Sequence, residues 1–237
     1  MRRVLLIAFI LLLSLSSLLA GDRAEFVNLG FSPNGNYFMF GFYGYDGEAH
    51  RSYSEIYTVD VDRNLFVPKG VSKGSYDYTV VPGQSVEGAL FTLLEENASI
   101  RTAYSIEYLE TGRPVYIRID DDPESPDNMV SDENSGMNNL EFKDFVTGDL
   151  YSLQLKQNSY EGIPVSSTFS LDFSVRSSDG LVQTYNIGHP NYKRSGVEKY
   201  NIDRVLVGPG NKSVIIILAK FYDNGNIRYM VETVKLK

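Results

Sequence analysis

The chain has 237 residues with 22 basic and 30 acidic side chains, and it contains 17 tyrosines, 13 phenylalanines, no tryptophan and no cysteine. Without cysteine, neither a disulfide framework nor a lipid-modified N-terminal cysteine is possible. The formal net charge of −8 repels phosphate backbones, so nucleic acid is not expected as a partner.

Residues 1–20 have the order of a secretory signal peptide. Two arginines precede the apolar run of residues 4–13, which is shorter than the roughly 20 residues of a membrane-spanning helix. Small residues follow up to Ala20, so cleavage there is expected to leave residues 21–237 with a net charge of −10. Leu18 stands where a small residue is usual, and an uncleaved N-terminal anchor is therefore the alternative.

Aromatic-rich strands bounded by turn residues are predicted along most of residues 21–237. In chain order we expect them at residues 26–31, 37–43, 55–61, 104–109, 115–119, 142–146, 150–155, 168–176, 181–187, 202–207, 214–221 and 227–236. One helix is predicted, with Ser85 as its N-cap, because Val86, Leu90 and Leu93 repeat at helical spacing. The aromatic residues 37–45 could form a sugar-stacking face, but apolar side chains on both faces of a strand favour a core position.

Turn residues separate three pairs of these strands as hairpins, including residues 104–109 with 115–119 around Thr111 and Gly112. This turn spacing predicts a mainly β fold, a single sandwich-like domain of antiparallel strands with one helix. Residues 31–38 also align with residues 207–214 at an offset of 176, each with a proline turn between two strands.

This strand–turn–strand unit resembles the repeat of WD40-like, TolB-type propellers, so an incomplete or irregular β-propeller is the alternative fold. The unit does not recur in residues 62–200 at the 40–45-residue period of a propeller, which favours the sandwich. The runs 29–33, 55–60, 188–194 and 228–233 also resemble an uncharacterised family of predicted secreted bacterial proteins. That resemblance implies export and assigns no activity.

Two patterns that can carry chemistry are interpreted as loops. Residues 70–74 spell G-x-S-x-G, but a nucleophile elbow requires a strand that turns into a helix, and the surrounding sequence predicts a flexible loop without a catalytic residue. Seven carboxylates fall within residues 120–133, which could suit calcium. A calcium loop needs glycine at its sixth and glutamate at its twelfth position, whereas Ser125 and Ser131 stand there, so a solvated acidic loop is expected and no metal site.

The basic segment of residues 189–204 contains the candidate ligand-binding residues His189 and Arg194, to which we add Arg228 from the last strand. Gly188 and Pro190 predict that His189 lies in a loop. A basic patch there could hold a carboxylate or phosphate, with Arg194 as the bidentate group. The alternative is that Arg194 and Arg204 pair with carboxylates in a purely structural role.

The sequence therefore predicts a secreted protein of the bacterial periplasm, because exported eukaryotic domains usually carry disulfides. We expect a non-enzymatic binding or scaffolding protein without a cofactor, whose partner is another protein or a small anionic ligand of the cell envelope. The alternative is a cell-envelope hydrolase whose Ser/His/Asp or carboxylate pair only the three-dimensional arrangement can reveal.

Overall fold

A computed structural model describes residues 21–77, 84–119 and 137–236. The described part contains twelve strands in three four-stranded antiparallel sheets, so the mainly β, sandwich-like prediction is confirmed. The signal peptide expected at residues 1–20 and the acidic segment 120–133 lie outside the described residues.

Each sheet is named by its place in the fold. The N-terminal sheet has the order β1 (Glu25–Phe31), β2 (Tyr37–Asp46), β3 (Arg51–Asp60) and β4 (Leu65–Tyr76). The central sheet has the order β12 (Ile227–Lys235), β11 (Ser213–Tyr222), β10 (Val197–Val207) and β5 (Arg113–Ile117). The outer sheet has the order β6 (Met137–Lys143), β7 (Leu150–Tyr160), β8 (Ser166–Arg176) and β9 (Val182–Ser195).

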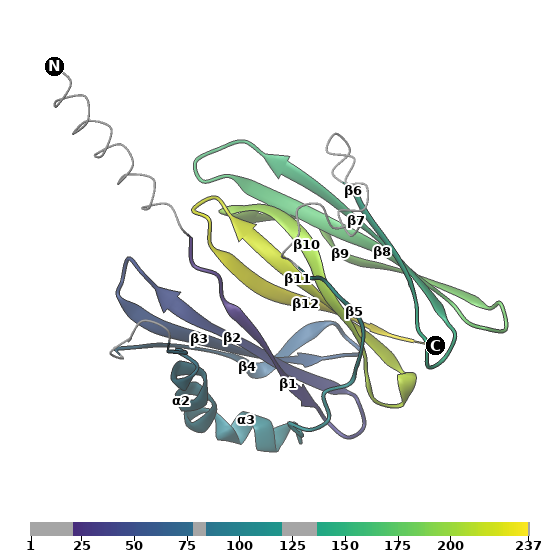
Figure 1. Ribbon diagram of the computed structural model, residues 1–237, viewed down its shortest axis with the longest axis horizontal. Coiled ribbons are helices and arrows are strands. Elements are labelled where there is room, and N and C mark those ends of the chain that lie inside the picture. Colours follow the sequence, from purple (N-terminus) through teal and green to yellow (C-terminus); the bar gives the residue numbers. More distant parts are fainter. Residues whose placement is uncertain (1–20, 78–83, 120–136, 237) are drawn as a thin grey trace, which may run out of the picture.

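The three sheets lie in layers, with the central sheet between the other two (Figure 1). Strand β11 shows why, because residues 213–219 are all buried and its apolar side chains point to both faces. Val214, Ile216 and Leu218 pack against the outer sheet, whereas Ile215 and Ile217 pack against the N-terminal sheet. Burial on both faces accounts for the uninterrupted apolar sequence of this strand.

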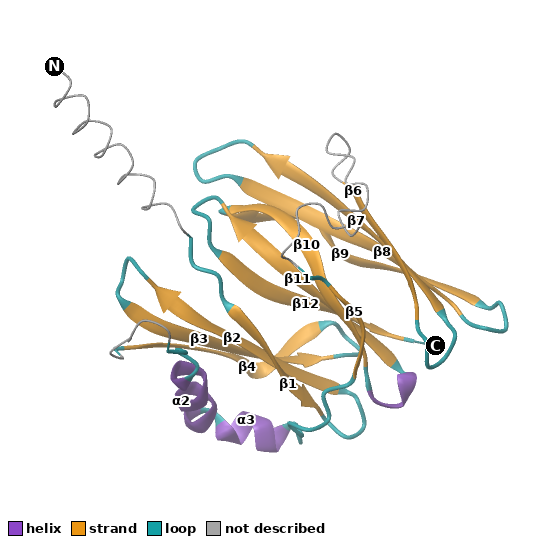
Figure 2. Cartoon of the chain, viewed as in Figure 1, coloured by secondary structure: helices purple, strands orange, loops and turns teal. Residues whose placement is uncertain are grey.

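Two helices, α2 (Gly88–Glu96) and α3 (Ala98–Ala103), cover the far face of the N-terminal sheet (Figure 2). Leu90 and Leu93 pack there against Met39 and Ile56, as the helical spacing predicts. Ser85 is not the N-cap, because the helix begins later and Glu87 occupies that position. Phe38, Phe40 and Phe42 of β2 face the central sheet, and Tyr37 and Tyr43 pack on the side of the helices, so these aromatic residues belong to the core.

The hairpin predicted at residues 104–119 is wrong. Residues 104–112 form no strand, and β5 pairs with β10 of the central sheet instead. The preceding segment is held against β1, where the Glu107 N–H donates to the Phe31 carbonyl oxygen at 2.9 Å. A long-range pairing thus replaces the local hairpin that Thr111 and Gly112 indicate.

The loop predicted at residues 70–74 is also wrong, because these residues belong to strand β4 and pair with β3. A register shift between Tyr57 and Val59 accommodates Gly70, whereas Gly74 pairs with Ser54 in register. The Ser72 hydroxyl donates to Asn97 Oδ1 at 2.8 Å, so it links β4 to the helices. A serine in the middle of an antiparallel strand does not form a nucleophile elbow.

The two proline turns that align in the sequence have the same backbone hydrogen bonds. Ser32 N–H donates to Tyr37 O and Gly35 N–H to Ser32 O. At the same offset of 176 residues, Gly208 N–H donates to Ser213 O and Asn211 N–H to Gly208 O. The two units are structurally equivalent, but they belong to two stacked sheets and do not share one ladder.

Candidate functional site

The three candidate residues lie on two edge strands, His189 and Arg194 on β9 of the outer sheet and Arg228 on β12 of the central sheet. The prediction that His189 lies in a loop is wrong, because β9 continues through Pro190 to Ser195. Pro190 is tolerated since an edge strand has one side without a ladder partner.

The wider basic segment does not gather at one place. The Lys193 ammonium lies 3.8 Å from the centre of the Tyr160 ring, and Lys199 lies 5.1 Å from that of Phe221. Arg204 pairs with Asp203 at 2.6 Å, which is the structural role that we considered as the alternative. Of the segment's cations, Arg194 has the most distinctive environment.

Arg194 packs its guanidinium carbon against three aromatic rings, at 4.7 Å from the centre of Phe169, 5.0 Å from Tyr192 and 5.9 Å from Tyr200. Its Nη1 atom is buried and has no hydrogen-bond partner among the described residues. It has no ion pair with a described carboxylate either, so the structural pairing proposed for Arg204 does not extend to it. The aromatic rings hold the cation in place without neutralising it.

Arg228, in contrast, is already compensated. Its Nη2 lies 2.9 Å from an Asp22 carboxylate oxygen, and its Nη1 donates to the Asp22 and Ile227 carbonyl oxygens. The guanidinium also covers the Tyr53 ring at 4.4 Å. Arg228 therefore links Asp22, near the start of the described chain, to β12. Its charge still lies beside Lys220, its ladder partner on β11.

A further cation, Lys220 of β11, was missed by sequence reasoning. Lys220 pairs in the ladder with Arg228 on one side and Tyr200 on the other. Its ammonium donates to Tyr222 Oη at 3.2 Å, and it forms no ion pair with any described carboxylate. The signal was present in the sequence, because Lys220 follows six consecutive apolar residues of β11.

Burial lowers the pKa of Lys220 to about 8, since the charged form loses its hydration. Glu55 opposes this shift, whereas Lys73, Arg194 and Arg228 lower the pKa further by charge repulsion. Glu55 itself is engaged by Lys73 at 2.8 Å and by the Tyr57 hydroxyl. The Glu55 carboxylate, which attracts the Lys220 ammonium, is thus already engaged by Lys73 and Tyr57.

Glu232 on β12 is the second titratable residue at this edge, with 4% of its surface exposed. Burial raises the pKa of Glu232 above its ordinary value. The Asn64 side-chain amide, which donates to the carboxylate, and the charges of Arg194 and His189 oppose this shift only in part. His189 and Arg194 therefore both act on Glu232, while Arg194 and Arg228 both act on Lys220. Among the described residues no hydrogen bond or ion pair joins His189, Arg194 and Arg228 to one another, so they are linked only through their charge effects on Lys220 and Glu232.

We call Lys220, Tyr222, Arg194 and Arg228 the Lys220 cluster. It offers two cationic groups without a described counter-ion and a phenol as an additional hydrogen-bond donor. Such an arrangement suits a small anion with oxygen acceptors. Within the described residues no group of three or more His, Asp or Glu side chains is placed to hold a metal ion.

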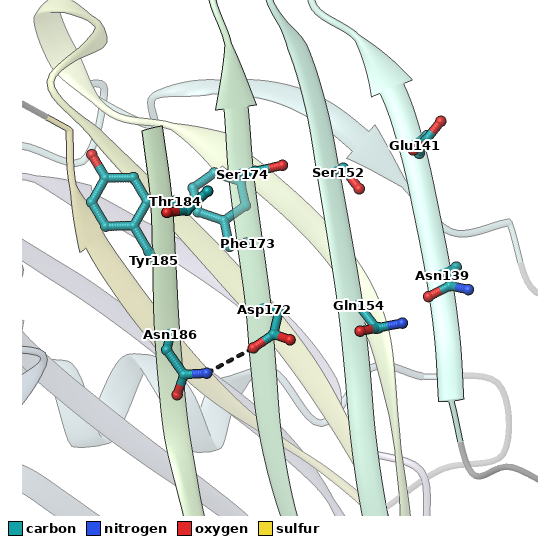
Figure 3. Close-up of a pocket in the computed structure, with 10 residues that line it drawn as sticks. All are labelled: Asn139, Glu141, Ser152, Gln154, Asp172, Phe173, Ser174, Thr184, Tyr185 and Asn186. Atoms are coloured by element: carbon teal, nitrogen blue, oxygen red, sulfur yellow. Dashed lines mark hydrogen bonds between the residues drawn. The ribbon is translucent and has the colours of Figure 1, made fainter. Parts of the chain in front are cut away.

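A broad hollow of about 1280 Å³ lies on the exposed face of the outer sheet (Figure 3). Eight polar side chains project there in two rows that follow the strand register: Asn139, Gln154, Asp172 and Asn186 in one, and Glu141, Ser152, Ser174 and Thr184 in the other. The Asp172 carboxylate already accepts from Asn186 at 2.7 Å and pairs with Lys156. Polar side chains on the solvated face of an antiparallel sheet are expected, so we assign no chemistry to the hollow.

The fold defines an all-β protein of layered antiparallel sheets, with a basic cluster at the edge of the central one. Among the helices of the described part, none is long and apolar enough to cross a membrane. Residues 39–235 match the model of a family described as predicted secreted protein (DUF2259), and the chain belongs to this family. The expected resemblance is thereby confirmed. A search of curated proteins finds no match to the chain.

Proposed function

We propose that this protein is a non-enzymatic binding protein of the bacterial periplasm that captures a small carboxylate or phosphate at the Lys220 cluster. The observation that supports the proposal is the half-buried Lys220 side chain, whose ammonium has no carboxylate partner among the described residues and whose pKa is lowered by burial. Burying an unpaired charge is costly, and in folded proteins such charges are normally paired. We expect a bound anion to supply the missing partner of the Lys220 ammonium, with Arg194 adding to the attraction by its charge.

The hydrolase alternative has less support from the geometry. A serine or carboxylate mechanism needs a base within hydrogen-bond reach of its nucleophile. His50 approaches the Tyr45 hydroxyl at 3.4 Å, and neither His50 nor His189 has a hydrogen bond to a serine or carboxylate of the described chain. Binding without chemistry is the function that the Lys220 cluster supports best.

Thermal unfolding with inorganic phosphate or succinate, compared with chloride at the same ionic strength, tests this proposal. A ligand that binds only the folded state raises its stability, and at about 100 times Kd the melting temperature should rise by about 5 °C. Lys220→Met should abolish the rise, and Arg194→Gln should weaken it. Lys156→Met is the matched control, because Lys156 is a half-exposed lysine of the outer sheet that pairs with Asp172.

The two outcomes that contradict the proposal are distinct. One is a wild-type protein that responds to phosphate and succinate no more than to chloride. The other is a Lys220→Met variant that keeps the full response, which would place the anion elsewhere. With succinate, the binding should also weaken above the pKa of Lys220, since the neutral amine no longer attracts a carboxylate.

A further inference from the structure

Lys220 lies in a row of three side chains that crosses the central sheet. In the antiparallel ladder it stands opposite Tyr200 of β10 on one side and Arg228 of β12 on the other. Side chains directly opposite each other in such a ladder share one face of the sheet, with their Cβ atoms about 5 Å apart. Lys220 and Arg228 are therefore neighbouring cations, and like charges in that position repel each other.

Arg228 has a counter-ion in this row, and Lys220 does not. The Asp22 carboxylate pairs with Arg228 at 2.9 Å, whereas the Lys220 ammonium has no ion pair with a carboxylate of the described chain. A lysine can relieve the repulsion by losing its proton, but an arginine stays protonated in proteins. The geometry of the row thus favours a neutral amine at Lys220.

The surroundings of Lys220 act in the same direction. Burial lowers its pKa to about 8, and the charges of Lys73, Arg194 and Arg228 lower it further, against that of Glu55. At about pH 7.5 an ordinary lysine is neutral in roughly one molecule in a thousand, whereas about a quarter of a group with this pKa is neutral. Lysines that are desolvated beside other cations serve as nucleophiles. The Lys220 side chain is only half-buried, so part of it remains open to solvent.

Tyr222 supplies a hydroxyl group beside the amine. Its Oη lies 3.2 Å from Lys220 Nζ, and residues two apart on a strand point to the same face. Burial raises the pKa of Tyr222 above its ordinary value, so the phenol keeps its proton at neutral pH. When the amine is neutral, the phenol can donate a hydrogen bond to a carbonyl oxygen that approaches Lys220.

We propose that Lys220 binds small oxo acids covalently, by forming a reversible imine with a carbonyl group next to the carboxylate of the ligand. Such an imine rests on the anion site proposed above and adds the chemical class of its ligand. The cations around Lys220 attract the carboxylate by their charge, which keeps the neighbouring carbonyl carbon near the amine. Succinate has no such carbonyl group and is held by charge alone.

The reaction needs no reactant besides the ligand. The lone pair of the neutral Lys220 amine forms a bond to the carbonyl carbon, and the electrons of the carbonyl double bond move to the oxygen. This oxygen leaves as water with the two amine protons, and a carbon–nitrogen double bond remains. Water reverses the same steps and releases the ligand. Nothing is oxidised or reduced, so the step is capture and release, as in a binding protein.

Reductive trapping in the full-length mature protein tests this proposal. Glyoxylate is the probe, and sodium cyanoborohydride converts its imine into a stable carboxymethyl group on the lysine nitrogen. Peptide mass spectrometry then gives the labelled fraction of each lysine. At about pH 7.5 we expect Lys220 to be labelled at least about tenfold more than Lys156, the half-exposed lysine that pairs with Asp172.

Acetaldehyde is the matched control probe, because it has a methyl group in place of the carboxylate of glyoxylate. Its preference for Lys220 over Lys156 should be at least about threefold smaller, since the cations do not attract it. Succinate should protect Lys220 from glyoxylate, because both anions occupy the same site. In the Lys220→Met variant the labelling of the remaining lysines should not change.

The outcomes distinguish the imine from the anion site on which it depends. Equal labelling of Lys220 and Lys156 by glyoxylate overturns covalent capture, and the anion site itself stays supported if succinate still raises the melting temperature. The same preference for Lys220 with both aldehydes overturns the ligand class, because the amine then reacts without recognising the carboxylate. Selective labelling by glyoxylate, in a protein whose melting temperature succinate does not raise, supports the imine and overturns the capture of simple anions proposed above.

Discussion

A lysine ammonium that leaves water loses its hydration, and Lys220 regains one hydrogen bond, to Tyr222, among the described residues. Its pKa of about 8 in the folded protein lies below the value of 10.5 for a free lysine. The unfolded chain therefore binds the proton more tightly than the folded one. Below about pH 8 Lys220 is protonated in both states, and the cost of placing its charge in the folded protein lowers the free energy of unfolding in full. This cost disappears as the pH rises from about 8 to 10.5, so the free energy of unfolding increases over that range.

Lys220→Met should consequently stabilise the protein without ligand. At pH 7 we expect its free energy of unfolding to exceed that of the wild type by about 1–3 kcal/mol, because the buried charge is gone. The difference should shrink at pH 9.5, where the wild type loses the proton. Urea denaturation at both pH values measures this, with Lys156→Met as the control. A Met variant less stable than the wild type at pH 7 contradicts the role assigned to Lys220.

Gly30 is a residue whose backbone position excludes a side chain. Its φ of 98° lies in the region that favours glycine, and an added Cβ would lie 2.2 Å from the Glu107 carbonyl oxygen. Gly30→Ala should cost about 2 kcal/mol or more, since the bulge of β1 and its contact with the segment at Glu107 cannot both persist. Gly47→Ala meets no atom within 4 Å and should change little. Equal melting temperatures of the two variants would contradict this.

The candidate site could be predicted in part. His189, Arg194 and Arg228 were chosen for their charge, and their charges affect Lys220 or Glu232, but their role as a binding site stays a prediction. The two central groups belong to no motif with a defined spacing, and the only sequence feature that marks Lys220 is its place directly after the apolar run of β11. Arg204 pairs with a carboxylate and Arg194 does not. This difference depends on contacts between sheets, which cannot be predicted from the local sequence.

At the level of single elements, period-two alternation and turn residues placed most strands correctly, including the hairpins of the outer sheet. Errors occurred where a distant partner decides the structure. The glycines of β4 indicate a loop, but the ladder with β3 holds them extended. Segment 104–109 has strand composition but lies beside β1 without joining a sheet, apart from one bridge between Phe31 and Glu107.

The last strand, β12, should be indispensable although it is an edge strand. Tyr229, Val231 and Val234 are buried, and the Ile227 N–H and O pair with the start of the described chain. Deletion of residues 227–237 exposes the ladder edge of β11, a nearly continuous apolar strand, and we expect an insoluble or non-cooperative product. Circular dichroism and sedimentation check this. A soluble truncation with a sharp melting transition would contradict it.

For the molecule as a whole, export is the first property to verify. The chain belongs to a family of predicted secreted proteins, and its backbone is tied into the fold from Asp22 onward, where Ile227 N–H donates to Asp22 O at 2.9 Å. N-terminal sequencing of the mature protein should find a start at or near Gly21. Recovery of intact Met1 in the soluble fraction would contradict cleavage after Ala20.

The central position of the last three strands has a consequence for the order in which the fold can form. Strands β10 to β12 come at the end of the chain, yet both other sheets bury their inner faces against them. During synthesis, which proceeds from the N-terminus, the helices can cover one face of the N-terminal sheet. Its other face has no cover until the strands of the central sheet have been made. Phe38, Phe40 and Phe42 therefore stay exposed until the final residues arrive. Folding should be slow and late, since non-local contacts must form together. A chain that cannot complete its core before its last residues is suited to crossing a membrane unfolded.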